Sequence, residues 1–146
     1  MKSVKILIME AVKEALTPLV SQTPKQGQGI PLDQDTARYP WICFFDELES
    51  KRANNRISQK TFDLVIQAWV KANLLTNSVD EQLDAIDAKI EQTIMNDPNI
   101  MARCLKIEPK SSEKFYVDDG ETGILQSIFE VVYVHKWKDP YDPVRG

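Results

Sequence analysis

The chain has 146 residues, of which 42% are hydrophobic and 27% charged, with a net charge of −4 and a pI near 5.1. This composition is typical of one globular domain and excludes a globally disordered chain. The acidic balance gives no general attraction for phosphates, so nucleic acid, including a sequence-specific site, is not an expected partner.

The first predicted element is an amphipathic helix over 3–20, because its apolar residues recur every three or four positions. Ser3 is a suitable N-cap, and Pro18 is expected to loosen the last turn. Charged residues interrupt the apolar stretch and no small-residue cleavage site follows, so we expect a helix and no signal peptide. The sequence contains no apolar run long enough to predict a membrane span. A polar linker rich in Gly and Pro is expected over 21–39.

Two strands are predicted after the linker. The aromatic run at 40–46 is typical of a short, buried strand, and the alternating apolar residues of 57–72 predict a long one. Between them we expect a polar connection at 48–56 with a turn at Asn54-Asn55, because Asn tolerates left-handed backbone conformations. The two strands should form an antiparallel pair.

The clearest local signal is a capping box, in which Ser78 precedes Glu81 by three residues at the start of an apolar helical repeat. It predicts a helix over 78–95, which the segment 96–99 should end at its Asp-Pro pair. Beyond this helix we expect a turn at 118–120 and strands at 102–108, 114–117 and 124–137.

The resulting order is a helix, two strands, a helix and several strands. It predicts an α+β fold with a mainly antiparallel sheet and two principal helices packed on one face. We expect a single domain over 1–137. The segment 138–146 contains two prolines and no periodic pattern, which indicates an extended and exposed C-terminal tail.

No catalytic, cofactor or metal site is predicted. The one histidine, His135, lies in a strand pattern and is expected to be a partly exposed pairing residue, because a lone imidazole supports neither a catalytic triad nor a zinc site. Acidic clusters at 46–49 and 118–121 are interpreted as solvated turns, with a divalent cation site or a small enzyme as the alternative. Cys43 and Cys104 are too few for a disulfide framework and are expected to be buried.

Two kinds of side chain are candidates for a protein interface. A basic loop within 51–56 is expected either to be a solvated hairpin tip or to contact an acidic partner. Two of the three tryptophans lie on the outer faces of long strands, where they would anchor an interface or pack under the long loop. Both faces of the last strand are apolar near its end, so one is expected to contact a neighbouring copy. The candidate interface residues are Lys51, Arg52, Arg56, Trp69, Tyr133 and Trp137.

Several features follow one another in an order that is shared with a known family. A Pro-led strand at 40–46 precedes a long strand at 62–70, and the helix at 78–95 ends in Asn96-Asp97-Pro98-Asn99-Ile100-Met101. A late strand ends in Val131-Val132-Tyr133-Val134. Over most of its length, as an order of elements, the chain resembles the phage tail-terminator and tail-completion proteins, which are small minor tail proteins.

The resemblance implies a structural protein of the virion that is assembled in the host cytoplasm, is not an enzyme and has no cofactor. Copies would form a closed ring, commonly a hexamer, through head-to-tail contacts on the end of the tail tube. The expected partners are sister copies, the tail tube protein, whose polymerisation the ring stops, and the head–tail connector protein. Another neck or head–tail joining protein, or an adaptor, is the alternative.

Overall fold

The computed structural model describes residues 1–20, 22–31, 39–53, 56–72, 78–117 and 120–143. Its elements are α1 (Val4–Leu16), the 3₁₀ turn η1 (Thr17–Leu19), β1 (Lys25–Gln26), β2 (Trp41–Ala53), β3 (Ile57–Lys71), α2 (Val79–Met95), α3 (Pro98–Arg103), β4 (Lys106–Val117) and β5 (Thr122–Lys136).

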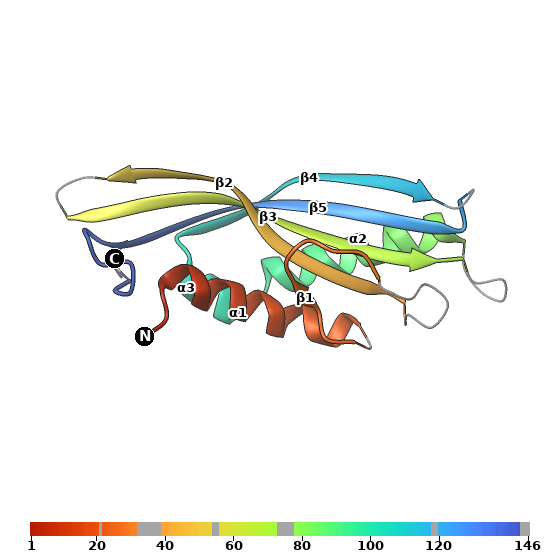
Figure 1. Ribbon diagram of the computed structural model, residues 1–146, viewed down its shortest axis with the longest axis horizontal. Coiled ribbons are helices and arrows are strands. Elements are labelled where there is room, and N and C mark those ends of the chain that lie inside the picture. The colour runs from red at the N-terminus through yellow and green to blue at the C-terminus, as the bar shows by residue number, and fades with distance from the viewer. Residues whose placement is uncertain (21, 32–38, 54–55, 73–77, 118–119, 144–146) are drawn as a thin grey trace.

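One five-stranded sheet forms the body of the molecule, with the strand order β1-β2-β3-β5-β4. The short β1 pairs in parallel with β2, and every other pair is antiparallel. All three α-helices lie on the same side of the sheet (Figure 1). The predicted α+β fold, with a mainly antiparallel sheet and two principal helices on one face, is confirmed.

Both predicted N-caps are present. The Ser3 hydroxyl accepts a hydrogen bond from the Ile6 amide at 3.2 Å, and the Ser78 hydroxyl accepts one from the Glu81 amide at 3.2 Å. Each bond satisfies an amide that the first helical turn leaves without a partner. The α-helix α1 ends at Leu16, earlier than predicted, because Pro18 has no amide proton to continue the ladder and the chain tightens into η1.

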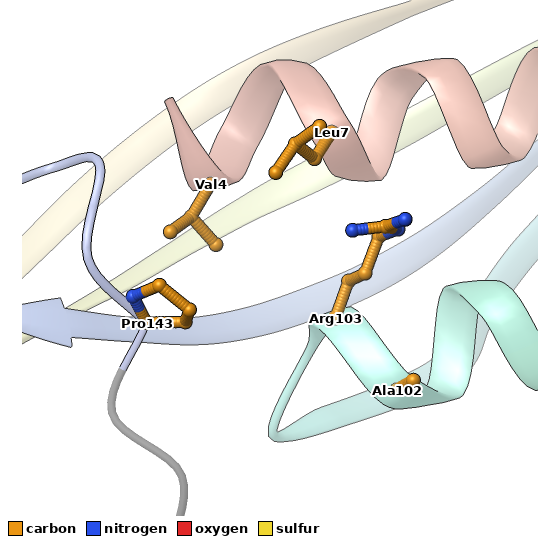
Figure 2. Close-up of a pocket in the computed structure, with 5 residues that line it drawn as sticks. All are labelled: Val4, Leu7, Ala102, Arg103 and Pro143. Carbon is orange, nitrogen blue, oxygen red and sulfur yellow. The ribbon is translucent and has the colours of Figure 1, made fainter. Parts of the chain in front are cut away.

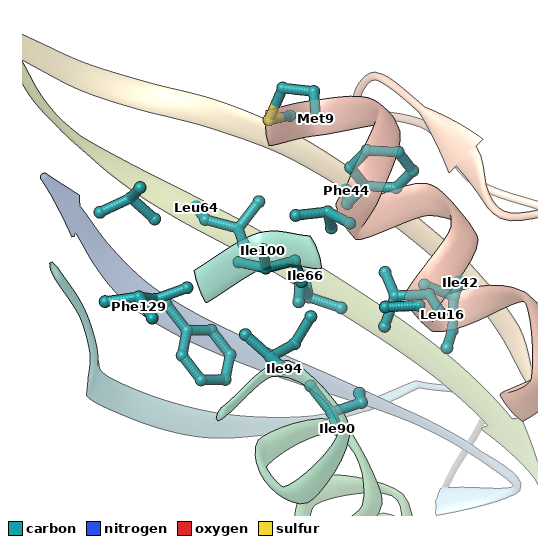
Figure 3. Packing of buried hydrophobic residues seen from close by; sticks show 14 of the residues in the cluster. Met9, Leu16, Ile42, Phe44, Leu64, Ile66, Ile90, Ile94, Ile100 and Phe129 are labelled. Carbon is teal, nitrogen blue, oxygen red and sulfur yellow. The ribbon is translucent and has the colours of Figure 1, made fainter. Parts of the chain in front are cut away.

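The core lies between the inner face of the sheet and the apolar stripes of α1 and α2 (Figure 3). Alternate residues of β3 and β5, such as Leu64 and Phe129, point into it and are fully buried. At Gly123 of β5 the helix α2 comes unusually close. A Cβ atom at Gly123 would lie 2.4 Å from Val79 Cγ1 and 2.9 Å from Leu83 Cδ1, so glycine permits this approach.

Strand β2 is longer than the sequence predicts. In place of a polar connection over 48–56, the strand continues to Ala53 and pairs with the first residues of β3. The register shifts between Glu47 and Ser50, where Leu48 has a φ of +54°. Beyond this bulge the strand is charged and exposed, so it shows no apolar alternation by which a strand is recognised. The predicted turn at Asn54-Asn55 lies outside the described residues.

The prediction that 102–108 is a strand was wrong in its first half. Residues 98–103 form α3, with the Asp97 carboxylate accepting hydrogen bonds from the amides of Asn99 and Ile100, both at 2.9 Å. The same Asp97-Pro98 pair that follows the end of α2 therefore begins a new helix, since proline fits the first helical position. The two predicted short strands merge into β4, and of the predicted turn at 118–120 the structure describes only Gly120, at a φ of +88°.

The described part of the C-terminal segment, residues 138–143, does not extend away from the domain as predicted. The Lys136 amide donates to the Asp142 carbonyl oxygen at 2.8 Å, and the Val4 amide donates to the Pro140 carbonyl oxygen at 3.0 Å. Lys136 and Asp142 also form an ion pair of 2.8 Å. The segment therefore folds back to the beginning of α1 and supplies a partner for an N-terminal helix amide.

Candidate assembly interface

A hairpin made of residues 50–53 of β2 and 56–61 of β3 is here named the basic arm. It extends beyond the helices at one end of the molecule (Figure 1). None of its described residues belongs to the apolar core. Within the arm, β2 pairs with β3, and β3 pairs in turn with β5, where Ser58 lies opposite His135 and Lys60 opposite Tyr133. Its side chains are therefore not needed to build the core.

The charge of the basic arm is of one sign. Residues 50–61 contain four basic and no acidic side chains. Lys51 and Lys60 face each other directly in the ladder, an arrangement that destabilises a pair of strands. Within the described residues Lys51, Arg52 and Lys60 form no ion pair. Among the described residues, these three side chains therefore keep a positive charge that no ion pair neutralises.

Trp137 lies beside the basic arm. Its amide donates a hydrogen bond to the Arg56 carbonyl oxygen at 3.0 Å, which fixes the end of β5 next to the start of β3. The Trp137 side chain is 45% exposed, and Tyr141 in the folded-back segment is 46% exposed. Of the six predicted interface residues, the structure thus brings Lys51, Arg52, Arg56 and Trp137 to one end of the molecule.

The other two predicted interface residues are buried. This corrects the prediction for Tyr133, and for Trp69 it favours the alternative that the side chain packs within the fold. Tyr133 is 2% exposed, because it points to the helix side of β5 and packs edge-on against Phe62 with 5.9 Å between ring centroids. Trp69 is 8% exposed on the outer face, where it packs edge-on against Trp41 at 6.4 Å. Cys43 belongs to the same outer cluster, and its Sγ lies 3.9 Å from the Gly29 carbonyl oxygen. The segment before β2 therefore covers this part of the outer face.

An ionic cluster fixes the base of the arm to α1. The Lys5 ammonium donates to Asp46 at 2.6 Å and to Glu49 at 2.5 Å; Asp46 precedes the bulge in β2 and Glu49 lies within it. Burial alone would lower the pKa of Lys5, but the hydrogen bonds to the two carboxylates outweigh it and raise this pKa. The Tyr133 hydroxyl lies 3.5 Å from Glu49, and burial and this carboxylate raise the pKa of Tyr133. Part of the acidic cluster predicted at 46–49 is therefore a structural clamp.

The opposite end of the molecule is acidic. Helix α2 contains five acidic residues and one lysine, and its first turns adjoin the last residues of the edge strand β4 (Figure 1). Tyr116 donates a hydrogen bond to Asp80, Lys114 pairs with Asp84, and Ser112 donates to Asp87 at 3.1 Å. We name the exposed part of this end the acidic flank, which consists of Asp80, Glu81, Asp84, Glu113, Phe115 and Tyr116.

Phe115 and Tyr116 are 44% and 50% exposed, so the acidic flank also presents aromatic rings. Glu81 and Glu113 form no ion pair in the part of the chain that the structure describes. Each end of the molecule therefore combines exposed aromatic side chains with unpaired charge, which is positive at Lys51, Arg52 and Lys60 of the arm and negative at Glu81 and Glu113 of the flank.

The histidine and the two cysteines are buried or half-buried in the fold. His135 is 4% exposed, contrary to the expectation of a partly exposed residue, and its Nδ1 lies 2.8 Å from the Lys136 carbonyl oxygen. Cys43 is buried as predicted, whereas Cys104 is half-buried. Burial raises the pKa of the Cys43 thiol and raises that of Cys104 to about 11, so both thiols are protonated at neutral pH.

No group of three or more metal-ligating side chains occurs among the described residues, a range that leaves out Asp118 and Asp119 of the second acidic cluster. The side chains that line one pocket come from α1, α3 and the folded-back segment (Figure 2). Val4, Leu7 and Arg103 line a pocket of about 30 Å³, and Glu10, Glu14 and Arg103 line an adjoining one of about 150 Å³. These volumes suit water or a small ion more than an organic substrate.

Two residues of the site were missed from the sequence. Lys60 was assigned to the strand and not to the basic loop, although a longer first strand would have placed it opposite Lys51. The helical pattern of 3–20 gives Lys5 no role, because that role depends on contacts with residues more than 40 positions away. The register of the hairpin could have revealed the position of Lys60, whereas no local signal in the sequence reveals the role of Lys5.

Comparison with protein-family models found no match to this chain, and comparison with curated proteins found no significant match either. None of the described helices has the length and apolar character needed to cross a membrane.

Proposed function

We propose that this protein is a phage tail terminator, a structural component of the virion that assembles in the host cytoplasm into a closed ring on the end of the tail tube. The observation that carries the proposal is the basic arm. This hairpin lies outside the apolar core and contains four basic residues, and the exposed Trp137 lies beside it. Arg, Trp and Tyr are the residues that most often dominate binding at protein interfaces.

The shape and charge of the subunit support an assembly made of identical copies. A closed ring needs two different surfaces on each copy, so that the contact repeats head to tail and then closes. The basic arm and the acidic flank lie at opposite ends of an elongated sheet (Figure 1). Because the two ends differ in sign, they favour a heterologous contact over a symmetric one between like ends.

The proposed ring has two further partners. One surface would contact the last layer of the tail tube protein and stop its polymerisation, and the other would contact the head–tail connector protein. A copy number of six is proposed from the resemblance in the order of elements. The proposal assigns no catalytic role, cofactor or metal to the chain.

The test uses the purified chain with the tail tube protein of the same genome. Mass photometry and negative-stain microscopy should show rings of one copy number, and addition of the rings to polymerising tubes should shorten the tubes and leave a ring at one end. Trp137→Ala should weaken ring formation, whereas Ile30→Ala, which removes another exposed apolar side chain, should not. A chain that stays monomeric and leaves tube length unchanged would rule out the terminator; binding to the connector alone would favour another neck protein.

A further inference from the structure

We propose that the basic arm of one copy docks on the acidic flank of a second copy of this chain. This inference rests on the proposed function, because it names the contact by which the ring is built. It commits to a second copy as the occupant of both surfaces. The argument uses charge, exposed aromatic area and the position of the two surfaces in the subunit.

The first step is charge complementarity within one sequence. Residues 50–61 contain four basic and no acidic side chains, and α2 contains five acidic residues and one basic residue. Lys51, Arg52 and Lys60 on the arm, and Glu81 and Glu113 on the flank, have no ionic partner within the described residues. Each surface therefore offers the charge that the other lacks, and complementary charge steers and orients association.

The second step is geometry. The arm and the flank lie at opposite ends of the long axis, and the strands that carry them, β2 and β4, lie on opposite sides of β3 and β5 in the sheet (Figure 1). Neither surface can reach the other within one subunit. When the contact forms between two copies, it leaves one arm and one flank free at the ends of the dimer, so further copies can add until the chain of subunits closes.

The third step decides between a second copy and DNA as the occupant of the arm. The whole chain carries a net charge of −4 and has a pI near 5.1, so long-range repulsion opposes approach to a polyanion. A second copy presents a local patch of negative charge without the charge density of a duplex. Trp137 on the arm side and Phe115 and Tyr116 on the flank add aromatic area that a protein–protein contact buries.

The experiment is a charge swap measured by sedimentation velocity at low and high salt. The arm variant is Lys51→Glu with Arg52→Glu, and the flank variant is Glu81→Lys with Glu113→Lys. All four side chains are exposed and make no described side-chain contact, so both variants should fold. The control, Lys13→Glu with Lys25→Glu, changes net charge as the arm variant does but on exposed residues elsewhere.

Self-association should weaken at least about tenfold in each variant, which corresponds to about 1.4 kcal/mol. It should recover when the two variants are mixed and when both changes are combined in one chain, because opposite charges then face each other again. The control should assemble like the unmodified chain, and high salt should weaken assembly of the unmodified chain.

The other outcomes overturn the inference. If both variants form rings and cap tubes as well as the unmodified chain, the arm–flank contact is wrong, whereas the proposed terminator function still holds. An arm variant that assembles normally but loses affinity for a DNA duplex would assign the arm to DNA. An unmodified chain that does not self-associate even at low salt and does not cap tubes would remove both proposals.

Discussion

Strands β2 and β3 run through two regions of the molecule that differ in what holds them. Under the helices their inner residues, such as Phe44 and Ile66, are fully buried. In the basic arm the same strands lie outside the apolar core: the β2 half is exposed and largely charged, and the β3 half is mostly half-buried. The arm is joined to the rest of the sheet by its ladder and, at its base, by the Lys5 clamp. The first region is stabilised by apolar burial, so its side chains are fixed by the fold. The second depends little on side-chain identity, which leaves its side chains available for binding.

The largest effect is expected from the helix-covered region. Phe129→Ala removes a fully buried ring at the centre of the core and should lower the free energy of unfolding by about 3–5 kcal/mol. Chemical denaturation of dilute protein, at concentrations below assembly, measures this change. A loss below about 1 kcal/mol would contradict the view that burial, and not the ladder, holds this part of the sheet.

The contrast between the regions also explains what the sequence predicts well. Caps at Ser3 and Ser78 and the apolar repeats after them are local signals, and the structure confirms both helices. The alternation in β3 correctly assigns Phe62, Leu64 and Ile66 to one face, because burial selects apolar residues at every second position.

Where burial does not select residues, the pattern fails. The arm half of β2 has no alternation and was assigned to a connection. Asp97-Pro98 was interpreted only as the end of a helix, although it also caps α3. Of the predicted interface, the basic residues and Trp137 are indeed exposed, but the burial of Trp69 and Tyr133 depends on which segments cover each face of the sheet. Which segment covers each face is a tertiary property, and the periodicity of a strand does not predict it.

An intermediate effect is expected at Tyr133, where the two regions meet. Burial, followed by the nearby Glu49 carboxylate, raises the pKa of Tyr133 above its ordinary value of 10.0. As the pH rises above 10.0, the unfolded chain releases this proton while the native state retains it, so stability falls with pH until the native pKa is reached. In Tyr133→Phe this contribution is absent.

The unfolding free energy of the unmodified chain should therefore fall more steeply above pH 10.0 than that of Tyr133→Phe, by up to about 1.4 kcal/mol per pH unit. Denaturant titrations at several alkaline pH values provide the two slopes. Lys5 has its pKa raised in the same direction, but it is present in both proteins and its effect largely cancels in the difference. Parallel curves would show that the base of the arm opens before Tyr133 titrates.

The smallest effect on folding is expected in the basic arm itself. Lys51→Gln with Arg52→Gln removes two exposed charges that have no described ionic partner, and it relieves the repulsion between Lys51 and Lys60. The unfolding free energy of the dilute protein should stay within about 0.5 kcal/mol of the unmodified value.

Lys13→Gln with Lys89→Gln is the matched control, since it removes the same charge from exposed helical positions. The unfolding free energy of the arm variant could instead fall by more than about 2 kcal/mol while that of the control does not. The arm side chains would then stabilise the fold and would not be free to bind a partner. A small change in folding together with weaker self-association would instead separate the two regions by function as clearly as their burial separates them by structure.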